Sequence, residues 1–423
     1  MQNDVVAKQP NCDDDYDSTS LTCDEALVRI LEAVAAVSGT ETLPIRETLG
    51  RVLASPVIST IDVPSHTNSA MDGFAVRTED VPPSGTKQLE VVGTAFAGKP
   101  YRGTVGKDQA IRIMTGAVVP PETNVVIMQE QVEISSDHSV TIDHRHKAGQ
   151  NVRAAGEDIA VGTEVLHCGH TIGPADLGLV ASLGIAEIDV YRKIRVAFLS
   201  TGDELRGVGE PLGIGEIYDS NRYTLHGMLT RLGVEIIDMG VVRDERKAVR
   251  NALKDAAGTA DVVITSGGVS VGEADYIKEV LIEIGEVRFW KVAMKPGRPL
   301  AFGSIDGAVF FGLPGNPVSV MVTFYQFVQP CIMKIMGAQA QPRILLKAEA
   351  GNTLKKRPGR VEYQRGFLTR NDVGAFIVRT ESDQGSGILS SMSNANCFVV
   401  LPMDSGRIEP GTLVDVQPFF GIM

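Results

Sequence analysis

The stretch from Asp261 to Tyr276, DVVITSGGVSVGEADY, decides the fold of this chain. It begins with an apolar run that ends at Thr265, continues with two glycines, Gly267 and Gly268, and ends at a helix start that carries acids. This order predicts a strand, a glycine-rich turn and a helix. In an open parallel sheet, such a turn lies at the carboxyl edge of the strands, where ligands bind and helix N-termini offer N–H groups to anions.

Two acids in the helix start, Glu273 and Asp275, indicate a divalent cation beside this turn. One or two carboxylates are enough to hold magnesium at a phosphate site. A turn and two acids are weak evidence alone, since any βα unit can carry glycines in its turn and acids at its helix start. The rest of the chain decides between a site and an ordinary turn.

Apolar runs and helical segments alternate from residue 191 to residue 340. The alternation predicts a doubly wound, mostly parallel α/β domain over 191–340, with a crossover helix after each strand. Residues with binding chemistry follow the strand ends, so they gather at one edge of the sheet. They are Thr201-Gly202-Asp203-Glu204, Ser266-Gly267-Gly268, Lys291 with Lys295-Pro296-Gly297-Arg298, and Pro314-Gly315-Asn316-Pro317. Packing explains each loop singly, but it does not explain all of them at one edge.

Helical patterns precede and interrupt a β-rich region in the first half of the chain. A capping box at Thr22 to Glu25 predicts a helix from Leu21 to Val37, and a second helix is predicted at Ala175 to Leu183. We expect the two helices to pack together. Short β-prone runs broken by Gly and Pro predict the β-rich region and a barrel or sandwich at the end of the chain.

The patterns therefore predict a multidomain α/β protein. Its parts are a disordered acidic tail (1–20), a helical and then β-rich first half, the α/β domain (191–340) and a last β-rich module after it.

Composition excludes some functions. The net charge of −12 disfavours nucleic-acid binding, which depends on clustered Lys and Arg. No apolar run approaches the length of about 18 residues that a membrane span needs. The five cysteines are odd in number and widely spread, which favours free thiols in a reducing cytosol. With a polar, acidic start that does not resemble a signal peptide, we expect a cytoplasmic protein.

A loop from Asn68 to Gly73 carries an acid, Asp72, that is placed for use because the loop has few bulky side chains. The Asp-Gly pair equally fits an Asx turn, in which Asp72 only bonds neighbouring backbone N–H groups. A second acid, Asp158, stands in Gly156-Glu157-Asp158 at the end of the β-rich region.

Eight motifs together resemble the MoeA family of bacterial molybdopterin molybdenumtransferases, from about residue 20 to the end of the chain. They are NSAMDGFAV at 68–76, RIMTGAVVP at 112–120, AAGEDI at 154–159, STGDEL at 200–205, IYDSNRY at 217–223, TSGGVSVGEADY at 265–276, KVAMKPGRP at 291–299 and LPGNPVS at 313–319. Eight motifs in order are far more specific than one glycine loop.

The resemblance implies a homodimer with a composite active site. The domains that it implies are an elongated helical dimerisation domain made from two segments (21–58 and 163–190), a β-rich inserted domain (59–162), the α/β domain (191–340) and a C-terminal β-barrel (341–423). It implies that the substrates are molybdate and adenylylated molybdopterin, that AMP is released with Mg²⁺, and that the protein meets other cofactor-biosynthesis proteins and molybdoenzymes transiently. The acids that it implies for catalysis are Asp72, Asp158, Glu204 and Asp275, with Asp261, Asp275 and Glu204 at the metal. Asp72 and Asp158 are expected to come from the second subunit. The substrate-binding residues that it implies are Thr115, Ser266, Gly267, Gly268, Lys291, Lys295, Arg298, Pro314, Asn316, Arg365 and Ser386.

The assignment of Asp261 to the metal is open, because Asp261 begins an apolar strand and could lie at the wrong edge of the sheet. Three other functions are also open: a molybdopterin adenylyltransferase, which resembles the α/β domain alone, a non-catalytic scaffold of the gephyrin kind, and a pterin-binding protein without turnover. The flanking motifs at 68–76 and 154–159 favour the molybdenumtransferase over the first, and the intact acids disfavour the last.

Overall fold

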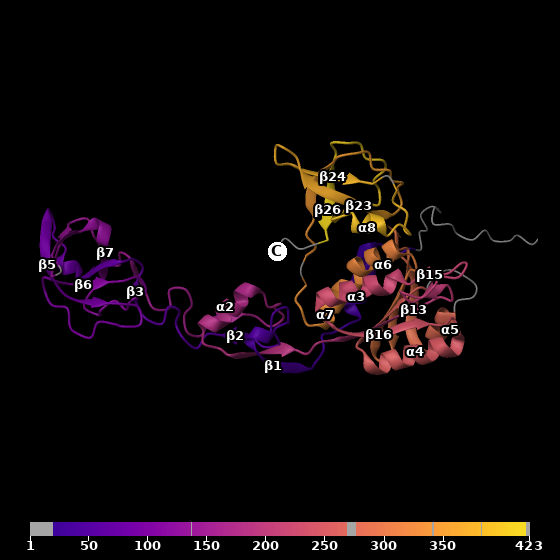
Figure 1. Ribbon diagram of the computed structural model, residues 1–423, viewed down its shortest axis with the longest axis horizontal. Helices are drawn as coiled ribbons and strands as arrows, with labels where there is room; N and C mark the ends of the chain where they lie inside the picture. Colours follow the sequence, from indigo (N-terminus) through magenta and orange to yellow (C-terminus); the bar gives the residue numbers. More distant parts are fainter. Residues whose placement is uncertain (1–19, 137, 269–275, 341, 382, 420–423) are drawn as a thin grey trace, which may run out of the picture. The chain divides into compact units, whose positions relative to one another are not determined.

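The computed structural model describes residues 20–136, 138–268, 276–340, 342–381 and 383–419 (Figure 1). The chain forms two compact units. The first comprises residues up to 41, residues 50–52 and residues from 191 onward, and the second comprises residues 42–49 and 53–190. Each unit has its own sheets and cores.

A six-stranded sheet in the order β16-β13-β17-β21-β20-β18 organises the first unit. The first four strands are parallel, β20 is antiparallel to β21, and β18 is antiparallel to β20. This confirms the predicted mostly parallel α/β domain. The strands are β16 (Glu235–Val242), β13 (Arg195–Thr201), β17 (Val262–Ser266), β21 (Ala308–Leu313), β20 (Pro299–Ile305) and β18 (Gly285–Lys291).

Helices cover both faces of this sheet (Figure 1) because successive side chains of a strand point to opposite sides. Val196 and Phe198 of β13 pack in one core with α3 and α6, and Ala197 and Leu199 pack in another with α4 and α5. The domain is therefore doubly wound. These helices are α3 (Ser220–Leu232), α4 (Arg246–Thr259), α5 (Tyr276–Ile284) and α6 (Pro317–Thr323).

The predicted closing helix is divided into α6, a π-helical turn η4 (Phe324–Val328) and α7 (Gln329–Ile335). Pro330 explains the division, because it has no N–H to bond the carbonyl of Gln326 four residues earlier. That carbonyl instead accepts from Nη2 of Arg343 at 2.6 Å. The run Pro317–Ile335 has the length and hydropathy to cross a membrane, but 67% of that apolar stretch is buried inside the protein, as in a core helix.

The first helix, α1 (Cys23–Glu32), begins with the predicted capping box: Thr22 Oγ1 accepts from Glu25 N, and Glu25 Oε2 accepts from Thr22 N. Its apolar stripe packs in the first unit against η4 and α7. The second predicted helix is α2 (Pro174–Ser182), which packs in a separate core of the second unit with η1 (Ile45–Glu47). The two helices thus belong to different compact units, and their packing against one another stays a prediction.

A closed five-stranded barrel follows the α/β domain, as predicted. It closes because β23 pairs with both β24 and β25. A short strand of the α/β domain, β19 (Met294–Lys295), pairs with the start of β23. This pairing joins the barrel to the loop from Lys291 to Arg298, which we call the basic loop. The barrel strands are β22 (Leu346–Ala350), β23 (Val361–Arg370), β24 (Phe376–Thr380), β25 (Cys397–Leu401) and β26 (Leu413–Pro418), and a short helix, α8 (Ser390–Ser393), precedes β25.

The second unit contains another six-stranded sheet, in the order β7-β4-β6-β5-β9-β8. Its central strand β4 is buried on both faces, with Phe74 in one core and Ala75 in the other. The strands are β4 (Gly73–Val76), β5 (Thr86–Ala95), β6 (Gln109–Ile113), β7 (Val125–Met128), β8 (Glu133–Ser136) and β9 (Ser139–Asp143). Shorter elements are β1 (Thr40–Pro44), β2 (Val57–Ile58), β3 (Asn68–Ser69), β10 (Val152–Arg153), β11 (Glu164–Leu166), β12 (Glu187–Tyr191), η2 (Thr78–Asp80) and η3 (Gln129–Gln131).

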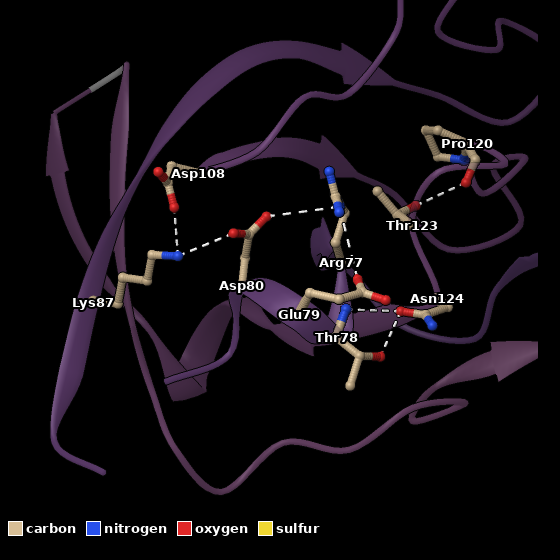
Figure 2. Close-up of polar contacts among 9 residues, drawn as sticks. All are labelled: Arg77, Thr78, Glu79, Asp80, Lys87, Asp108, Pro120, Thr123 and Asn124. Atoms are coloured by element: carbon tan, nitrogen blue, oxygen red, sulfur yellow. Dashed lines mark hydrogen bonds and ion pairs between the residues drawn. The ribbon is translucent and has the colours of Figure 1, made fainter. Parts of the chain in front are cut away.

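A polar network fixes the turn after β4 (Figure 2). The carboxylate of Asp80 is 2% exposed and accepts from Nζ of Lys87 at 2.9 Å, while Nε of Arg77 lies 3.9 Å from its other oxygen. Lys87 also pairs with Asp108. Since a buried carboxylate is tolerated only with cations and donors around it, this network holds η2 in place.

Candidate active site

The carboxyl ends of β13 and β17 form the topological switch point of the sheet. The chain leaves β13 toward β16 on one side and leaves β17 toward β18 on the other. Ligands bind at such points in open α/β sheets. The two strands end at Thr201 and Ser266, and β21 ends beside them at Leu313. The structure thus brings the predicted loops after these strands to one edge.

Gly267 joins the loop after β17 to the end of β21 at this edge. Its N–H donates to the carbonyl of Leu313 at 3.1 Å. Its φ is +92°, and a Cβ at this position would lie 3.0 Å from the carbonyl oxygen of Thr201. A side chain would meet both penalties, so glycine is required here. Gly268 is equally restricted, with a φ of +68° and Ile277 against the position of a Cβ.

Asn221, in the first turn of α3, ties two of the loops together. Its Nδ2 donates to Oγ of Ser266 at 2.8 Å and to the carbonyl of Gly315 at 2.7 Å. Asp219 caps the same helix by accepting from the N–H of Arg222. Sequence reasoning missed Asn221, although the IYDSNRY motif contains it, because a helix start explains the residue equally well.

The basic loop lies at the same edge. Since β18 is antiparallel to β20 and β20 to β21, the carboxyl end of β18 at Lys291 reaches the edge where β21 ends. The loop closes where the N–H of Val292 donates to the carbonyl of Arg298. Lys295 Nζ lies 4.0 Å from Oε1 of Glu362. Next to it, Pro314 is buried and Asn316 is the exposed N-cap residue of α6.

Acids gather on the other flank of β13. Glu204 is exposed in the turn after β13, and its carboxylate folds over Gly202. Asp244 follows β16, and its N–H donates to Oδ1 of Asp203 at 3.3 Å. Burial, and then the charges of Asp203 and Glu204, hold the pKa of Asp244 above its ordinary value. Sequence reasoning missed Asp244, although it follows a parallel strand just as Glu204 does.

A cavity of about 610 Å³ adjoins these acids, within the size range of small-molecule sites. Three arginines, Arg206, Arg222 and Arg243, line it together with two acids, Asp203 and Glu210. Arg206 pairs with Glu216, and Arg222 Nε donates to Asp238 at 2.7 Å. The lining residues are Gly202, Asp203, Leu205, Arg206, Gly207, Glu210, Arg222, Val241 and Arg243.

Arg365 and Ser386 lie in the barrel and its loop. Arg365 is 2% exposed, and its guanidinium donates to the carbonyls of Gln384 and Gly385 and to Oγ of Ser391. Burial lowers the pKa of Arg365. The carbonyl of Ser386 accepts from the N–H of Val318 at the start of α6. In this structure, Arg365 therefore braces the loop that places Ser386 near the end of β21.

Asp261 lies at the opposite edge of the sheet, which corrects its assignment to the metal. It precedes β17, so it stands at the amino end of a strand whose carboxyl end is Ser266. Arg192 donates to both of its oxygens, at 2.6 and 2.9 Å, and the N–H of Arg195 donates at 2.7 Å. Burial raises the pKa of Asp261, but these hydrogen bonds outweigh burial and leave it below its ordinary value.

The second unit contains Asp72, Thr115 and Asp158. Asp72 is exposed, and its Oδ1 accepts from both the N–H and the hydroxyl of Thr115 at 2.7 Å. These two bonds hold its pKa below the ordinary value. Asp72 is thus oriented by a distant residue, not by a local Asx turn. Asp158 is exposed in its own loop.

The segment that carries Glu273 and Asp275 lies outside the described residues, so their placement stays a prediction. Elsewhere in the described part of the chain, no group of three His, Cys, Asp or Glu side chains is arranged to hold a metal. Asp203, Glu204 and Asp244 lie near one another after β13 and β16 without forming such a group. Magnesium is held by one or two carboxylates together with substrate phosphates.

Comparison with known proteins yields three family matches in order along the chain. The MoeA N-terminal region (domain I and II) matches residues 21–184, a probable molybdopterin binding domain matches residues 197–334, and the MoeA C-terminal region (domain IV) matches residues 347–419.

Similar proteins cover nearly the whole chain. A molybdopterin molybdenumtransferase of Haemophilus influenzae is 47% identical over 94% of this chain and 98% of its own length. One from Nostoc is 38% identical over 86% of this chain and 85% of its own length. The crystal structure of the molybdopterin biosynthesis moeA protein from Pyrococcus horikoshii has a TM-score of 0.83 at 29% identity, covering 95% of this chain and all of that one.

Proposed function

We propose that this chain, which belongs to the MoeA family, is a molybdopterin molybdenumtransferase of molybdenum cofactor biosynthesis. It inserts molybdate into adenylylated molybdopterin and releases AMP. The observation that carries the proposal is the gathering of Thr201, Ser266 to Gly268, the basic loop from Lys291 to Arg298 and Asn316 at one sheet edge. An anionic substrate needs such N–H-rich turns and cations.

The two flanks of β13 suit different parts of the substrate. Lys291, Lys295 and Arg298 are cations that suit the molybdate oxyanion, with Asn316, Pro314 and the Ser386 loop beside them. The arginine-lined cavity beyond β13 suits the phosphate of the nucleotide. We therefore propose that the substrate lies across the end of β13, with its phosphoanhydride near Glu204.

The acids of this edge suit a magnesium ion. Glu204 and Asp275 are the proposed ligands, and the raised pKa of Asp244 beside Asp203 and Glu204 supports cation binding there. Magnesium, when bound, would neutralise the charge that develops as the phosphoanhydride breaks. The chain itself would orient the phosphate, through the turn that Gly267 fixes and the nearby cations.

We further propose a homodimer with a composite site. Asp72, Thr115 and Asp158 belong to a different compact unit from Glu204 and Ser266. The proposal is that one protomer contributes these three residues to the site of its partner. Variants that abolish dimerisation and retain full activity would contradict it.

A reducing compartment fits the cysteines, and we propose the cytoplasm. Among the described residues, no disulfide joins Cys23, Cys168, Cys331 or Cys397. Burial raises the pKa of Cys331 and Cys397 to about 12, so these thiols stay protonated and unreactive. Placing the protein there also gives it access to other cofactor-biosynthesis proteins and to molybdoenzymes.

The test of the activity is AMP release from adenylylated molybdopterin with magnesium and micromolar molybdate. Wild type, Asp275→Asn and a control, Asp255→Asn on the exposed face of α4, are compared. We expect molybdate-dependent release by the wild type and the control, and loss with Asp275→Asn while pterin binding is retained. No release by the wild type would contradict the proposal and favour the scaffold. Synthesis of the adenylylated pterin from ATP would favour the adenylyltransferase.

A further inference from the structure

Two buried oxygen atoms at the start of α3 have no hydrogen-bond partner among the described residues. They are Oδ1 of Asn221 and Oδ2 of Asp219. Asp219 is 3% exposed, and only its other oxygen is used, in capping α3. A buried acceptor without a donor costs free energy, so such atoms are rare unless a ligand or water completes them.

The orientation of Asn221 is fixed by its neighbours. Its nitrogen donates to Ser266 Oγ and to the carbonyl of Gly315, and a carbonyl can only accept. The nitrogen must therefore face Gly315, which leaves Oδ1 as an acceptor. A ligand that completes Oδ1 has to offer an N–H or O–H group.

The parts of the proposed substrate differ in what they offer. Phosphate and molybdate oxygens are acceptors, so an unpaired carboxylate or amide oxygen repels them. A pterin carries two donors side by side on its pyrimidine ring, the 2-amino group and the N3–H group. Adenine carries an amino group as well, but the arginine-lined cavity lies beyond β13, whereas Asn221 bonds the loops after β17 and β21.

We propose that Asn221 and Asp219 read the amino edge of the pterin. Oδ1 of Asn221 and Oδ2 of Asp219 accept hydrogen bonds from this edge, while Nδ2 of Asn221 keeps the two loops joined. The inference rests on the proposed function, because that function supplies the pterin. It assigns pterin selectivity to two residues that lie close to Arg222 in the chain and that the proposed reaction does not otherwise use.

The experiment compares two fluorescent probes, 6-hydroxymethylpterin and 6-hydroxymethyllumazine, which carries an oxygen where the pterin carries its amino group. Dissociation constants are measured by fluorescence for the wild type, Asn221→Ala, Asp219→Asn and a control, Asn251→Ala on the exposed face of α4. We expect the wild type and the control to prefer the pterin by about tenfold or more, as for one hydrogen bond to a buried acceptor. Asn221→Ala should abolish most of this preference.

Asp219→Asn keeps the helix cap, since Asn caps as well as Asp, so the variant should fold. Its new amide can donate to the lumazine oxygen, and we expect the preference to shift toward lumazine. An unchanged preference in both variants would overturn the inference. So would an equal loss of affinity for both heterocycles and for AMP, because that result assigns Asn221 to loop positioning alone.

The outcomes separate this inference from the proposed function, because probe binding needs no turnover. If the wild type prefers the pterin through these residues but releases no AMP, the proposed function is contradicted and the inference is supported. If the wild type does not prefer the pterin, the inference is contradicted even when AMP is released.

Discussion

Two aspartates at opposite ends of the same sheet show how a structural acid differs from an acid at a site. Asp261, before β17, has the Arg192 guanidinium and the N–H of Arg195 on its carboxylate. Asp244, after β16, has Asp203 and Glu204 near it instead. The pKa of Asp261 is lowered and that of Asp244 is raised.

The difference teaches where the fold supplies its own counter-ion and where a ligand has to supply it. A carboxylate with a built-in cation stabilises the native state, and removing it leaves an unpaired charge. Acids placed beside one another repel, so their arrangement lowers stability until a cation binds. Substitutions of acids from both groups, those paired with a cation of the fold and those beside other acids, test this difference.

The largest effect is expected from Glu204→Gln, which removes an acid without a built-in cation. Turnover in the AMP-release assay should fall at least about a hundredfold, equivalent to roughly 2.7 kcal/mol of transition-state stabilisation. Urea unfolding without magnesium should give at least the wild-type stability, because the variant removes one of the repelling charges. Asp255→Asn serves as the control and should retain activity. Full turnover by Glu204→Gln would remove Glu204 from the site.

Asp80→Asn should have the largest effect on stability, because its carboxylate is 2% exposed between Lys87 and Arg77 (Figure 2). We expect a loss of about 2 kcal/mol in urea unfolding, below the usual cost of breaking a buried pair because Lys87 keeps Asp108. Asp108→Asn is the matched control, since this residue is 51% exposed and bonds the same lysine. It should cost much less than Asp80→Asn, because solvent screens an exposed pair. Equal losses would show that burial does not set the strength of these pairs.

Asp261→Asn should cost about 1.5 kcal/mol, between the values for surface and buried pairs, and should leave turnover of the folded protein unchanged. Because the folded pKa of Asp261 is lowered, its contribution is present above the unfolded pKa and is lost as pH falls through the folded value. The difference between wild type and variant should therefore shrink below about pH 4. A double-mutant cycle with Arg192→Gln measures the coupling. Lost turnover at unchanged stability would return Asp261 to the site.

Which residues lie at which edge of the sheet could largely be predicted from the sequence, because the pattern of apolar runs shows where the strands end. The loops at Thr201, Ser266 and Leu313 were found in this way, and the parallel sheet brings them together. Strand direction also predicts the sheet edge at which Asp261 lies, since a residue that precedes a parallel strand lies at the amino edge. The assignment of Asp261 to the metal came from the family resemblance and not from this pattern.

Other parts of the site have no local signal. The pairing of Asp72 with Thr115 spans 43 residues, and the burial of Arg365 depends on the closure of the barrel. Asn221 and Asp244 resemble ordinary residues at helix starts. What distinguishes them is tertiary: a bridge between two loops and an acidic neighbourhood.

Asp244→Asn should have the smallest effect, and its sign is opposite to that of Asp261→Asn. Because the folded pKa of Asp244 is raised, its ionised form is disfavoured, and this penalty is present above the unfolded pKa. The variant should be more stable than the wild type at pH 7, by less than about 1 kcal/mol, and should match it at pH 3.

Melting temperatures measured with millimolar magnesium test the role of Asp244 further. A cation that binds among Asp203, Glu204 and Asp244 stabilises the native state by mass action, so it should raise the melting temperature of the wild type more than that of Asp244→Asn. Asp255→Asn should respond like the wild type. If Asp244→Asn is instead destabilised at pH 7 and magnesium raises both melting temperatures equally, Asp244 is a structural acid like Asp261, and the division between the two edges fails at this residue.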